Sequence, residues 1–390
     1  MKRPVLLLLA AAFLGSCVSA PYTGRRQLML VGEGQEIATG QEAYKEVLRD
    51  SVTTDDAKAV AIVRRIGQRI ANVANKPEYN WEFRVINDPE MVNAFCVPGG
   101  KVAVYTGIFP AAHDEAGLAV VLGHEVAHAL LRHSGERMSQ SELLGAGMAL
   151  AGASGVNPGI LQALGLGASV GLVLPFSRSQ ETEADQVGLL LMAKAGYDPR
   201  AALEVWERMA RLEKGAPPAF LSTHPSNESR IQDLRAMLPD ALKYYQGAAN
   251  ERGEVLPSPQ SLDTAAARAE RELLKRIQTI NSYVEQQSGE RPIVAALAAE
   301  LRLSPQVIVQ ERQQFRTGYG QYTALRGLSY IGRSSINRIV ADYQRGYPWS
   351  QIAQANGSGV DELNAWLGNV IRTTNEKVRQ LRTQPNYRYR

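Results

Sequence analysis

Residues 116–131 read AGLAVVLGHEVAHALL, an apolar stretch that contains two histidines and one glutamate. Apolar residues all round such a stretch indicate a helix buried in a protein core, and Asp114 just upstream is a plausible N-cap. Burying three titratable side chains is costly unless something compensates them. A chain with this stretch must therefore fold around a polar centre, and a divalent cation is the compensating group that we expect.

The two histidines of this stretch have the spacing of metal ligands. His124 and His128 are four residues apart, so on a helix both imidazoles point the same way and reach one metal ion. Glu125 follows the first histidine and lies where a carboxylate can take a proton from a water that the metal polarises. The alternative is a pair of satisfied core histidines beside an unrelated glutamate. Two of the five positions in this motif can hold any residue, so chance matches occur. Other residues of the chain must therefore distinguish a metal site from buried histidines.

A zinc hydrolase needs a third protein ligand and an open fourth position. The extended metzincin pattern, which has a glycine and a third histidine after the motif, is absent. A second helix over residues 177–192 offers carboxylates instead. Glu181 and Asp185 share one face of it; Glu181 is the expected ligand, and Asp185 is expected to hydrogen bond a ligating histidine. Glu183 points away from that face and is the weaker candidate. An exposed acidic helix start is the alternative.

Together these motifs resemble the gluzincin metallopeptidase family of the CAAX prenyl endopeptidase and HtpX, over about residues 22–240. A narrower resemblance is to the periplasmic lipoprotein members such as BepA and LoiP. The family implies an endopeptidase with one Zn²⁺ per chain, ligated here by His124, His128 and Glu181. The strings that carry the resemblance are TGRRQLMLV at the start, HEVAH, ETEAD, GYDP at 196–199, and Thr223-His224-Pro225 with Arg230-Ile231 after it.

The resemblance also implies a role for the histidine of the Thr-His-Pro turn, His224. In this family it approaches the metal either as a fourth, autoinhibitory ligand or as a group that polarises the oxyanion, and both roles stay open. Arg230 is a second candidate for the oxyanion donor. The chain has five histidines. We interpret the two that are left, His113 and His133, as surface residues or as residues behind the ligands.

With 390 residues, 45% of them hydrophobic, the chain has room for two domains with full cores. We predict an α+β fold, a zincin-type metalloprotease domain that is mostly helical with a small β-sheet, followed by an α-helical accessory domain. The predicted divisions are a lipoprotein signal peptide at 1–16, an N-terminal tether at 17–33, the protease domain at 34–240, a polar linker at 241–262 and the accessory domain at 263–390.

Within the protease domain, residues 34–74 are expected to form an upstream helix. Residues 81–87 and 101–106 have strand-like patterns, and Val-Pro-Gly-Gly at 97–100 between them is a turn signal. An exposed edge in this hairpin region could bind an extended peptide by adding a strand, although an ordinary structural sheet is at least as good an explanation. We interpret the Gly-, Ala- and Leu-rich segment 143–174 as two small helices, one of them a lid over the cleft.

The first twenty residues, MKRPVLLLLAAAFLGSCVSA, have a basic start, an apolar run and small residues before a cysteine. This pattern is typical of a bacterial secretion signal. Leu-Gly-Ser-Cys resembles a lipobox, so we predict cleavage before Cys17 and a lipid on it that anchors the protein to a membrane; secretion after Ala20 is the alternative. Because Val18 follows, the family's sorting rule suggests the outer membrane. The predicted location is the bacterial cell envelope, facing the periplasm.

The accessory domain contains two similar stretches, 297–308 and 352–363, which each read as helix, short turn, helix. The second resembles a helix-turn-helix or LysM-like unit. The tetratricopeptide pattern that BepA-type relatives carry is absent. We expect a protein or peptidoglycan contact and no nucleic acid partner. A helical domain that merely packs on the protease is the alternative.

The predicted function is a zinc-dependent endopeptidase of the bacterial envelope that cuts unfolded or misassembled envelope proteins in quality control. The biological role rests on the resemblance alone. The alternative is a chaperone-like assembly factor that binds unfolded envelope proteins while its proteolysis stays latent.

Overall fold

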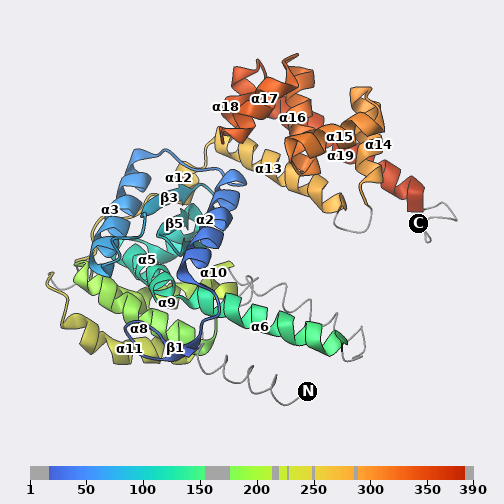
Figure 1. Ribbon diagram of the computed structural model, residues 1–390. Coiled ribbons are helices and arrows are strands. Elements are labelled where there is room, and N and C mark those ends of the chain that lie inside the picture. Colours follow the sequence, from blue (N-terminus) through green and yellow to red (C-terminus); the bar gives the residue numbers. More distant parts are fainter. Residues whose placement is uncertain are drawn as a thin grey trace. The chain divides into compact units, whose positions relative to one another are not determined.

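The computed structural model describes residues 17–153, 176–212, 219–225, 228–247, 251–284 and 289–382 (Figure 1). The predicted signal peptide and most of the predicted lid segment lie outside these ranges. The chain divides into two compact units. Unit 1 holds Met1–Leu48 and Thr53–Leu262, and unit 2 holds Arg49–Val52 and Asp263–Arg390. The predicted fold class is confirmed, because a mostly helical domain with a small sheet is followed by a helical one.

Unit 1 is built from short strands and a larger number of helices. They are β1 (Cys17–Ser19), β2 (Arg26–Leu28), α2 (Glu33–Arg49), α3 (Ala57–Ala74), β3 (Glu82–Ile86), β4 (Ala94–Val97), β5 (Lys101–Tyr105), η1 (Thr106–Ile108), α4 (Phe109–Ala112), α5 (Glu115–Leu130), α6 (His133–Ala153), α8 (Arg178–Lys194), α9 (Ala201–Leu212), α10 (Ala219–Thr223), α11 (Glu228–Leu242) and α12 (Pro259–Leu262).

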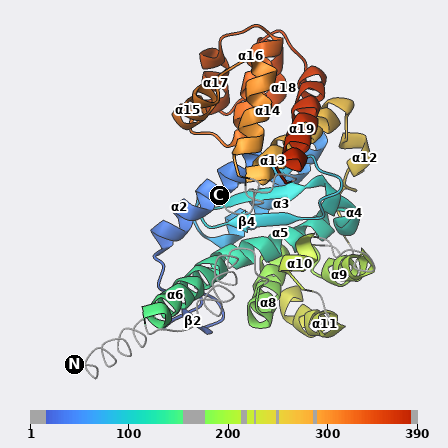
Figure 2. The same cartoon turned by 90° about the vertical axis from the view of Figure 1, so that its right-hand side faces the viewer.

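Helix α5 is the centre of unit 1, and every residue from Glu115 to Leu130 is buried. Its N-cap is Asp114, as predicted, whose side chain accepts a hydrogen bond from the backbone N–H of Gly117 at 2.9 Å. The sheet lies along one side of α5 and α8 along the other (Figure 2). The helix is thus packed on both sides, and this is why its polar residues are buried along with its apolar ones.

Helices α5 and α8 approach each other closely where two glycines meet. A Cβ atom on Gly123 would lie 2.8 Å from the carbonyl oxygen of Gly188, and one on Gly188 would lie 2.9 Å from the backbone nitrogen of His124. Any side chain at either position would push the helices apart. The two glycines therefore allow the carboxylates of α8 to reach the histidines of α5.

The sheet differs from the predicted hairpin. Its order is β3-β5-β4, with β5 parallel to β3 and antiparallel to β4. The hairpin partner of β5 is therefore β4, and the turn between them contains Gly99 and Gly100, which both have positive φ (91° and 84°). A parallel pair cannot be joined by a tight turn, so residues 87–100 form the connection between β3 and β5 and include β4.

Two segments that were predicted as connections pack on unit 1. Residues 17–31, which we call the N-terminal strap, contain the antiparallel pair β1 and β2, and Ala20 and Val31 in it are buried. Within the predicted linker 241–262, Leu256 and Leu262 belong to the core of unit 1. These segments are polar on average, but their few apolar residues are buried and attach them to unit 1.

The predicted upstream helix at 34–74 is two helices. Helix α2 ends at Arg49, and α3 begins at Ala57 after the N-cap Asp56, whose side chain accepts a hydrogen bond from the backbone N–H of Ala59. The residues between the helices include Val52, which belongs to the core of unit 2.

Unit 2 is helical throughout its described residues. Its helices are α13 (Ala265–Tyr283), α14 (Arg291–Leu301), α15 (Pro305–Phe315), α16 (Tyr319–Ile331), α17 (Ile336–Gln344), α18 (Trp349–Ala355) and α19 (Val360–Arg382).

The two stretches of unit 2 that read alike both form helix, turn, helix, as α14–α15 and α18–α19. Among the described helices, none is by itself long and apolar enough to cross a membrane. The pair α14–α15 meets the length and composition test only when its two helices, bent by 106°, are taken together.

Candidate metal centre

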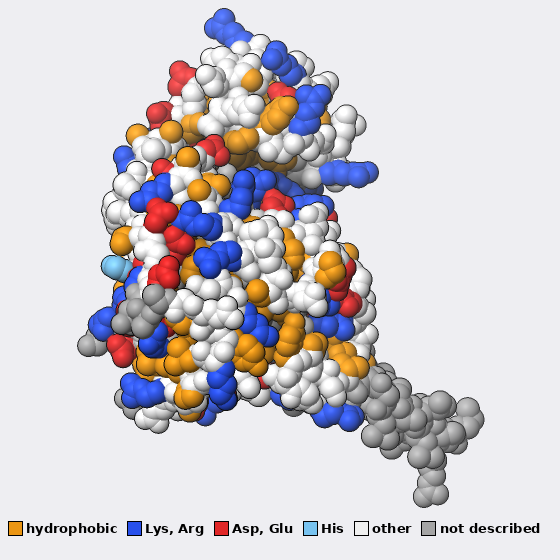
Figure 3. All heavy atoms as spheres, turned by 90° about the vertical axis from the view of Figure 1, so that its left-hand side faces the viewer, with side chains coloured by type: hydrophobic (Ala, Val, Ile, Leu, Met, Phe, Trp, Pro, Cys, Tyr) orange, Lys and Arg blue, Asp and Glu red, His pale blue; other side chains and the backbone are white. Residues whose placement is uncertain are grey.

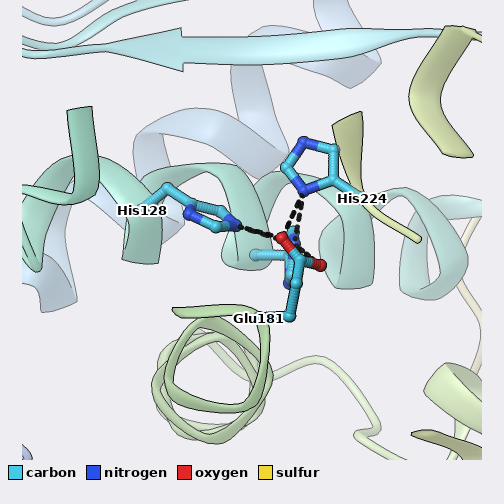
Figure 4. A group of neighbouring side chains, drawn as sticks. His128, Glu181 and His224 are labelled. Carbon is cyan, nitrogen blue, oxygen red and sulfur yellow. Dashed lines mark hydrogen bonds and ion pairs between the residues drawn. The ribbon is translucent and has the colours of Figure 1, made fainter. Parts of the chain in front are cut away.

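Four buried side chains from three segments of unit 1 converge on one point. His124 and His128 come from α5, Glu181 from α8, and His224 directly follows α10. Figure 4 shows the imidazoles of His128 and His224 directed at the Glu181 carboxylate. None of the four residues is more than 5% exposed. The structure thus brings together the three predicted ligands and the histidine of the Thr-His-Pro turn.

The spacing of the four donor atoms suits a small tetrahedral ion. His124 Nε2 lies 3.0 Å from His128 Nε2 and 3.2 Å from His224 Nδ1, and the Glu181 oxygens lie 3.0–3.5 Å from the three imidazoles. With zinc bonds of about 2.0–2.1 Å, the corners of a tetrahedron are about 3.3 Å apart. Two histidines and one glutamate are also a donor set that zinc accepts in catalytic sites. The residues present therefore fit a zinc ion.

The electrostatics of the cluster favour a positive charge at this point. Burial opposes the charged form of His124, but its hydrogen bonds to Asp185 and Glu181 outweigh burial and raise its pKa to about 9. For Glu181, hydrogen bonds from His124, His128 and His224 outweigh burial and lower the pKa. Burial lowers the pKa of His128 well below its ordinary value. Glu181 and His128 are therefore in the forms that bind a metal, whereas His124 must give up a proton when a cation takes that place.

Glu125 lies beside the four donors without being one of them. Its side chain is 4% exposed, and Oε1 is 3.4 Å from His224 Nε2. That oxygen forms no hydrogen bond to any residue that the structure describes. Burial raises the pKa of the Glu125 carboxyl, although the neighbouring histidines His224 and His124 act against the rise. A buried carboxylate with a raised pKa and an unused acceptor is suited to proton transfer near neutral pH.

The outer nitrogen of His124 meets a carboxylate directly. Nδ1 lies 2.9 Å from Asp185, as predicted, and Arg230 contacts the same carboxylate through Nε and Nη2, both at 2.8 Å. Arg230 Nη1 is 2.6 Å from Glu181, and its guanidinium stacks 3.5 Å above the ring of Trp206. With these carboxylate contacts and 5% exposure, Arg230 orients Asp185 and Glu181; its role as an oxyanion donor stays a prediction.

The outer nitrogen of His128 meets a second histidine. His133 is fully buried, with its Nδ1 2.8 Å from His128 Nδ1 and its Nε2 3.1 Å from Glu183. Glu183 also accepts hydrogen bonds from Arg25, at 2.6 Å, and from Thr23. Sequence reasoning left His133 open between the surface and a place behind the ligands, and it missed Arg25. The one available signal was the string TGRRQLMLV, which contains both Thr23 and Arg25.

His224 is held in place by stacked rings. Phe176 lies on one side, with centroids 5.1 Å apart and planes at 29°, and Phe220 is stacked at 4.6 Å and 28°. Arg137 lies 3.9 Å from the Phe176 centroid. In contrast, the side chain of His113 is 58% exposed and takes no part in the centre. On the face drawn in Figure 3, the pale blue of histidine is almost absent, in keeping with the burial of the other four histidines.

The fold and the centre define a metallopeptidase of the HExxH-plus-glutamate class. The model of peptidase family M48 matches residues 57–238. Mitochondrial metalloendopeptidase OMA1 of Schizosaccharomyces pombe is 42% identical over 226 residues, which are 57% of this chain and 66% of that protein. The OMA1 of Saccharomyces cerevisiae is 33% identical over 250 residues, covering 58% and 70%. The chain belongs to peptidase family M48.

A bacterial relative matches at lower identity. The beta-barrel assembly-enhancing protease of Escherichia coli is 28% identical over 240 residues, which are 58% of this chain and 48% of that protein. The narrower resemblance to BepA and LoiP is therefore not confirmed. The chain spans between 44% and 70% of the length of the OMA1 proteins that it matches.

The predicted location in the bacterial cell envelope needs correction. The relatives of higher identity, from fungi, plants and animals, are all named as mitochondrial proteins. The prediction rested on the first twenty residues and on the BepA resemblance. The first sixteen residues lie outside the described part of the chain, and the identities contradict the second argument. The lipid on Cys17 stays a prediction.

Proposed function

We propose that this chain is a zinc-dependent endopeptidase that hydrolyses peptide bonds of unfolded or misassembled proteins. The observation that carries the proposal is the convergence of His124, His128 and Glu181 at tetrahedral spacing, with the carboxylate of Glu125 beside them. The names of the M48 relatives, which describe metalloendopeptidases, support the same activity. We propose protein quality control as the biological role, and we no longer place it in the bacterial envelope.

Each residue of the centre has a role that follows from its chemistry. His124, His128 and Glu181 would hold the zinc ion, which supplies a Lewis acid for the scissile carbonyl and lowers the pKa of bound water to about 7. Glu125 takes the proton of the attacking water and passes it to the leaving amine. Asp185 and Arg230 keep His124 and Glu181 in place.

His224 lies close enough to the other three donors to compete with a substrate or water for the fourth position. Its Nδ1 is as close to His124 and Glu181 as the other donors are to one another, at 3.2 and 3.0 Å. A catalytic zinc site keeps one position open, whereas a site closed by four protein ligands is typical of structural zinc. We therefore propose that His224 is an inhibitory fourth ligand and that the described state is latent. This arrangement is also the observation that favours the alternative of a binding protein with latent proteolysis.

Unfolded chains are the proposed substrate class because of the depth of the centre. All four donor residues are at most 5% exposed, so a folded surface cannot present a peptide bond to them. An extended segment can enter by pairing with a strand edge, and β4 is an edge of the sheet that packs on α5. The partner of unit 2, predicted as a protein or peptidoglycan contact, stays a prediction.

The test compares casein cleavage by the wild type and by Glu125→Gln, with zinc content measured in both. We expect the variant to keep its zinc and to lose activity by about 10²-fold or more, because general-base catalysis contributes about 10²–10⁴-fold. Glu207→Gln, on the exposed face of α9, is the matched control and should cleave like the wild type. Because a latent wild type can itself be inactive, the same pair is compared in the His224→Ala background. Equal cleavage with and without Glu125→Gln in both backgrounds would overturn the enzyme proposal.

The latency proposal has its own test. His224→Ala should raise casein cleavage if the histidine is an inhibitory ligand. A fall in cleavage at unchanged zinc content would instead assign His224 to the oxyanion.

A further inference from the structure

The proposed chemistry leaves one buried group of side chains without a role. His133 has no exposed surface, and the side chain of Glu183 is only 8% exposed. Neither belongs to the cluster of donor atoms, and Glu183 lies on the side of α8 away from Glu181. Burying a histidine and a carboxylate is costly without a compensating interaction. Their contacts form one continuous chain that begins at a metal ligand.

The direction of the hydrogen bonds in this chain follows from the ligand itself. His128 must offer the lone pair of Nε2 to a metal, so its proton resides on Nδ1. That proton points at His133 Nδ1, 2.8 Å away, which must therefore be the acceptor. The proton of His133 then resides on Nε2 and is donated to Glu183 over 3.1 Å. One carboxylate thus fixes the tautomers of both imidazoles.

Glu183 is held in turn by the N-terminal strap. Arg25 Nε donates to Glu183 Oε2 at 2.6 Å, and the hydroxyl of Thr23 donates to Oε1. The remaining Arg25 nitrogens donate to Glu136 at 2.9 and 2.6 Å, so the guanidinium bridges the carboxylates of α6 and α8. Glu136 also accepts a hydrogen bond from Gln180, in the first turn of α8. The strap is therefore joined to both helices that carry the chain of contacts.

We propose that His133, Glu183 and Arg25 are positioning residues that orient the imidazole of His128 for the metal, which makes the N-terminal strap a working part of the metal centre. The inference rests on the proposed zinc endopeptidase. Through the strap, residues far from the HEVAH motif in sequence influence the affinity for the metal. Carboxylate support of ligating histidines is worth 10–100-fold in affinity in other metalloproteins.

The experiment measures the zinc dissociation constant of the full-length protein by competition with a chromophoric chelator. The variants are His133→Leu, Arg25→Gln and the double variant, with Arg25→Lys as the conservative exchange. Arg65→Gln is the matched control, because Arg65 also clamps a buried glutamate, Glu115 at the first turn of α5, without contact to a ligand. The absorption spectrum of the Co²⁺-loaded protein reports the ligand geometry independently of turnover.

We expect His133→Leu and Arg25→Gln each to weaken zinc binding by about tenfold and to alter the Co²⁺ spectrum. The double variant should bind no more weakly than His133→Leu alone, since both act through one chain of contacts. Arg25→Lys should lie between wild type and Arg25→Gln, because lysine keeps the charge but cannot bridge both carboxylates in the same way. Arg65→Gln should match the wild type.

Any of three results would contradict this positioning role. They are unchanged zinc affinity in folded His133→Leu, additive losses of zinc affinity in the double variant, and a loss of zinc affinity in Arg65→Gln as large as in Arg25→Gln. If His133→Leu does not fold, the comparison of Arg25→Gln with Arg25→Lys and Arg65→Gln decides alone, because Arg25 is partly exposed. Failure of the proposed function looks different. In that case the wild type itself would neither bind zinc nor cleave casein.

Discussion

His124 and His128 lie one turn apart on the same helix, yet their outer nitrogens face different partners. His124 meets Asp185 directly, and Arg230 secures that carboxylate from within the core. His128 reaches its carboxylate only through His133, and the arginine behind it comes from the N-terminal strap. We call Asp185 with Arg230 the His124 arm, and His133 with Glu183 and Arg25 the His128 arm. Both arms end in an arginine–carboxylate pair, but the His128 arm has an additional residue, His133, between the ligand and the carboxylate.

The difference teaches where the centre can be adjusted. The His124 arm is sealed, because Arg230 is 5% exposed and stacks on Trp206. The side chain of Arg25 is 26% exposed, so the His128 arm ends near the surface. Screening by solvent weakens an exposed ion pair more than a buried one. We therefore expect the His124 arm to supply most of the rigidity and the His128 arm to be the one that outside influences can change.

The largest effect is expected where the two arms meet. Glu181 contacts both histidines, so Glu181→Gln should weaken zinc binding by more than about 100-fold, beyond the loss of any single supporting residue. Chelator competition measures this loss. Glu207→Gln is the control, and an affinity within twofold of the wild type in Glu181→Gln would remove Glu181 from the ligand set.

A smaller loss is expected from the sealed arm. Asp185→Asn keeps the shape of the side chain but removes the charge that faces His124 and Arg230, so zinc affinity should fall by about 10–100-fold. Glu183→Gln, its counterpart in the other arm, should cost less because it acts through His133. A larger loss of zinc affinity in Glu183→Gln than in Asp185→Asn would contradict the expected difference between the two arms.

Next in size is a change that affects both arms through the backbone. In Gly188→Ala the new methyl group would lie 2.9 Å from the backbone nitrogen of His124, so α5 and α8 must separate. We expect a loss of about 1–3 kcal/mol in unfolding free energy, measured by denaturant titration. Gly34→Ala, which meets open space in α2, is the control. A Gly188→Ala protein as stable as the wild type would show that the close approach of the helices is not required.

The smallest effect is expected at the outer end of the sealed arm. Trp206→Leu removes the ring under Arg230, an interaction worth about 0.5–2 kcal/mol. Only part of this energy reaches the ligands through Arg230, so zinc affinity should fall by less than tenfold. In an Asp185→Asn background the same exchange should cost less zinc affinity, because Arg230 then supports the centre only through its contact with Glu181. Trp349→Leu, in the core of unit 2, should leave zinc binding unchanged. Equal losses in both tryptophan variants would point to general destabilisation.

The inner part of this centre was predictable because it depends on local helical geometry. His124 and His128 share a face of α5, as Glu181 and Asp185 share a face of α8, and 3.6 residues per turn is enough to see both. The cap at Asp114 follows from the same kind of local pattern. Each of these features is decided within a few residues along the chain.

The outer part was not predictable, because it depends on where one helix stops. If α5 continued as a helix past His128, His133 would lie on a different face from the ligands. However, α5 ends at Leu130, and Arg132 adopts a left-handed conformation with φ of 56°. The chain thereby turns, and His133 starts α6 facing back towards His128. Arg25 was missed because it meets Glu183 across 158 residues, a distance at which sequence patterns carry no pairing information.

The N-terminal strap also has a consequence for how the molecule is built. Residues 23 and 25 are synthesised before everything that they hold, and Arg25 cannot close its ion pair until Glu183, 158 residues later, has left the ribosome. Contacts of such long sequence separation pay their loop-closure entropy late in folding. The half of the centre on α5 can therefore form while the strap is still undocked. Full zinc affinity is therefore expected only after α8 and the strap have packed together, late in the folding of the domain.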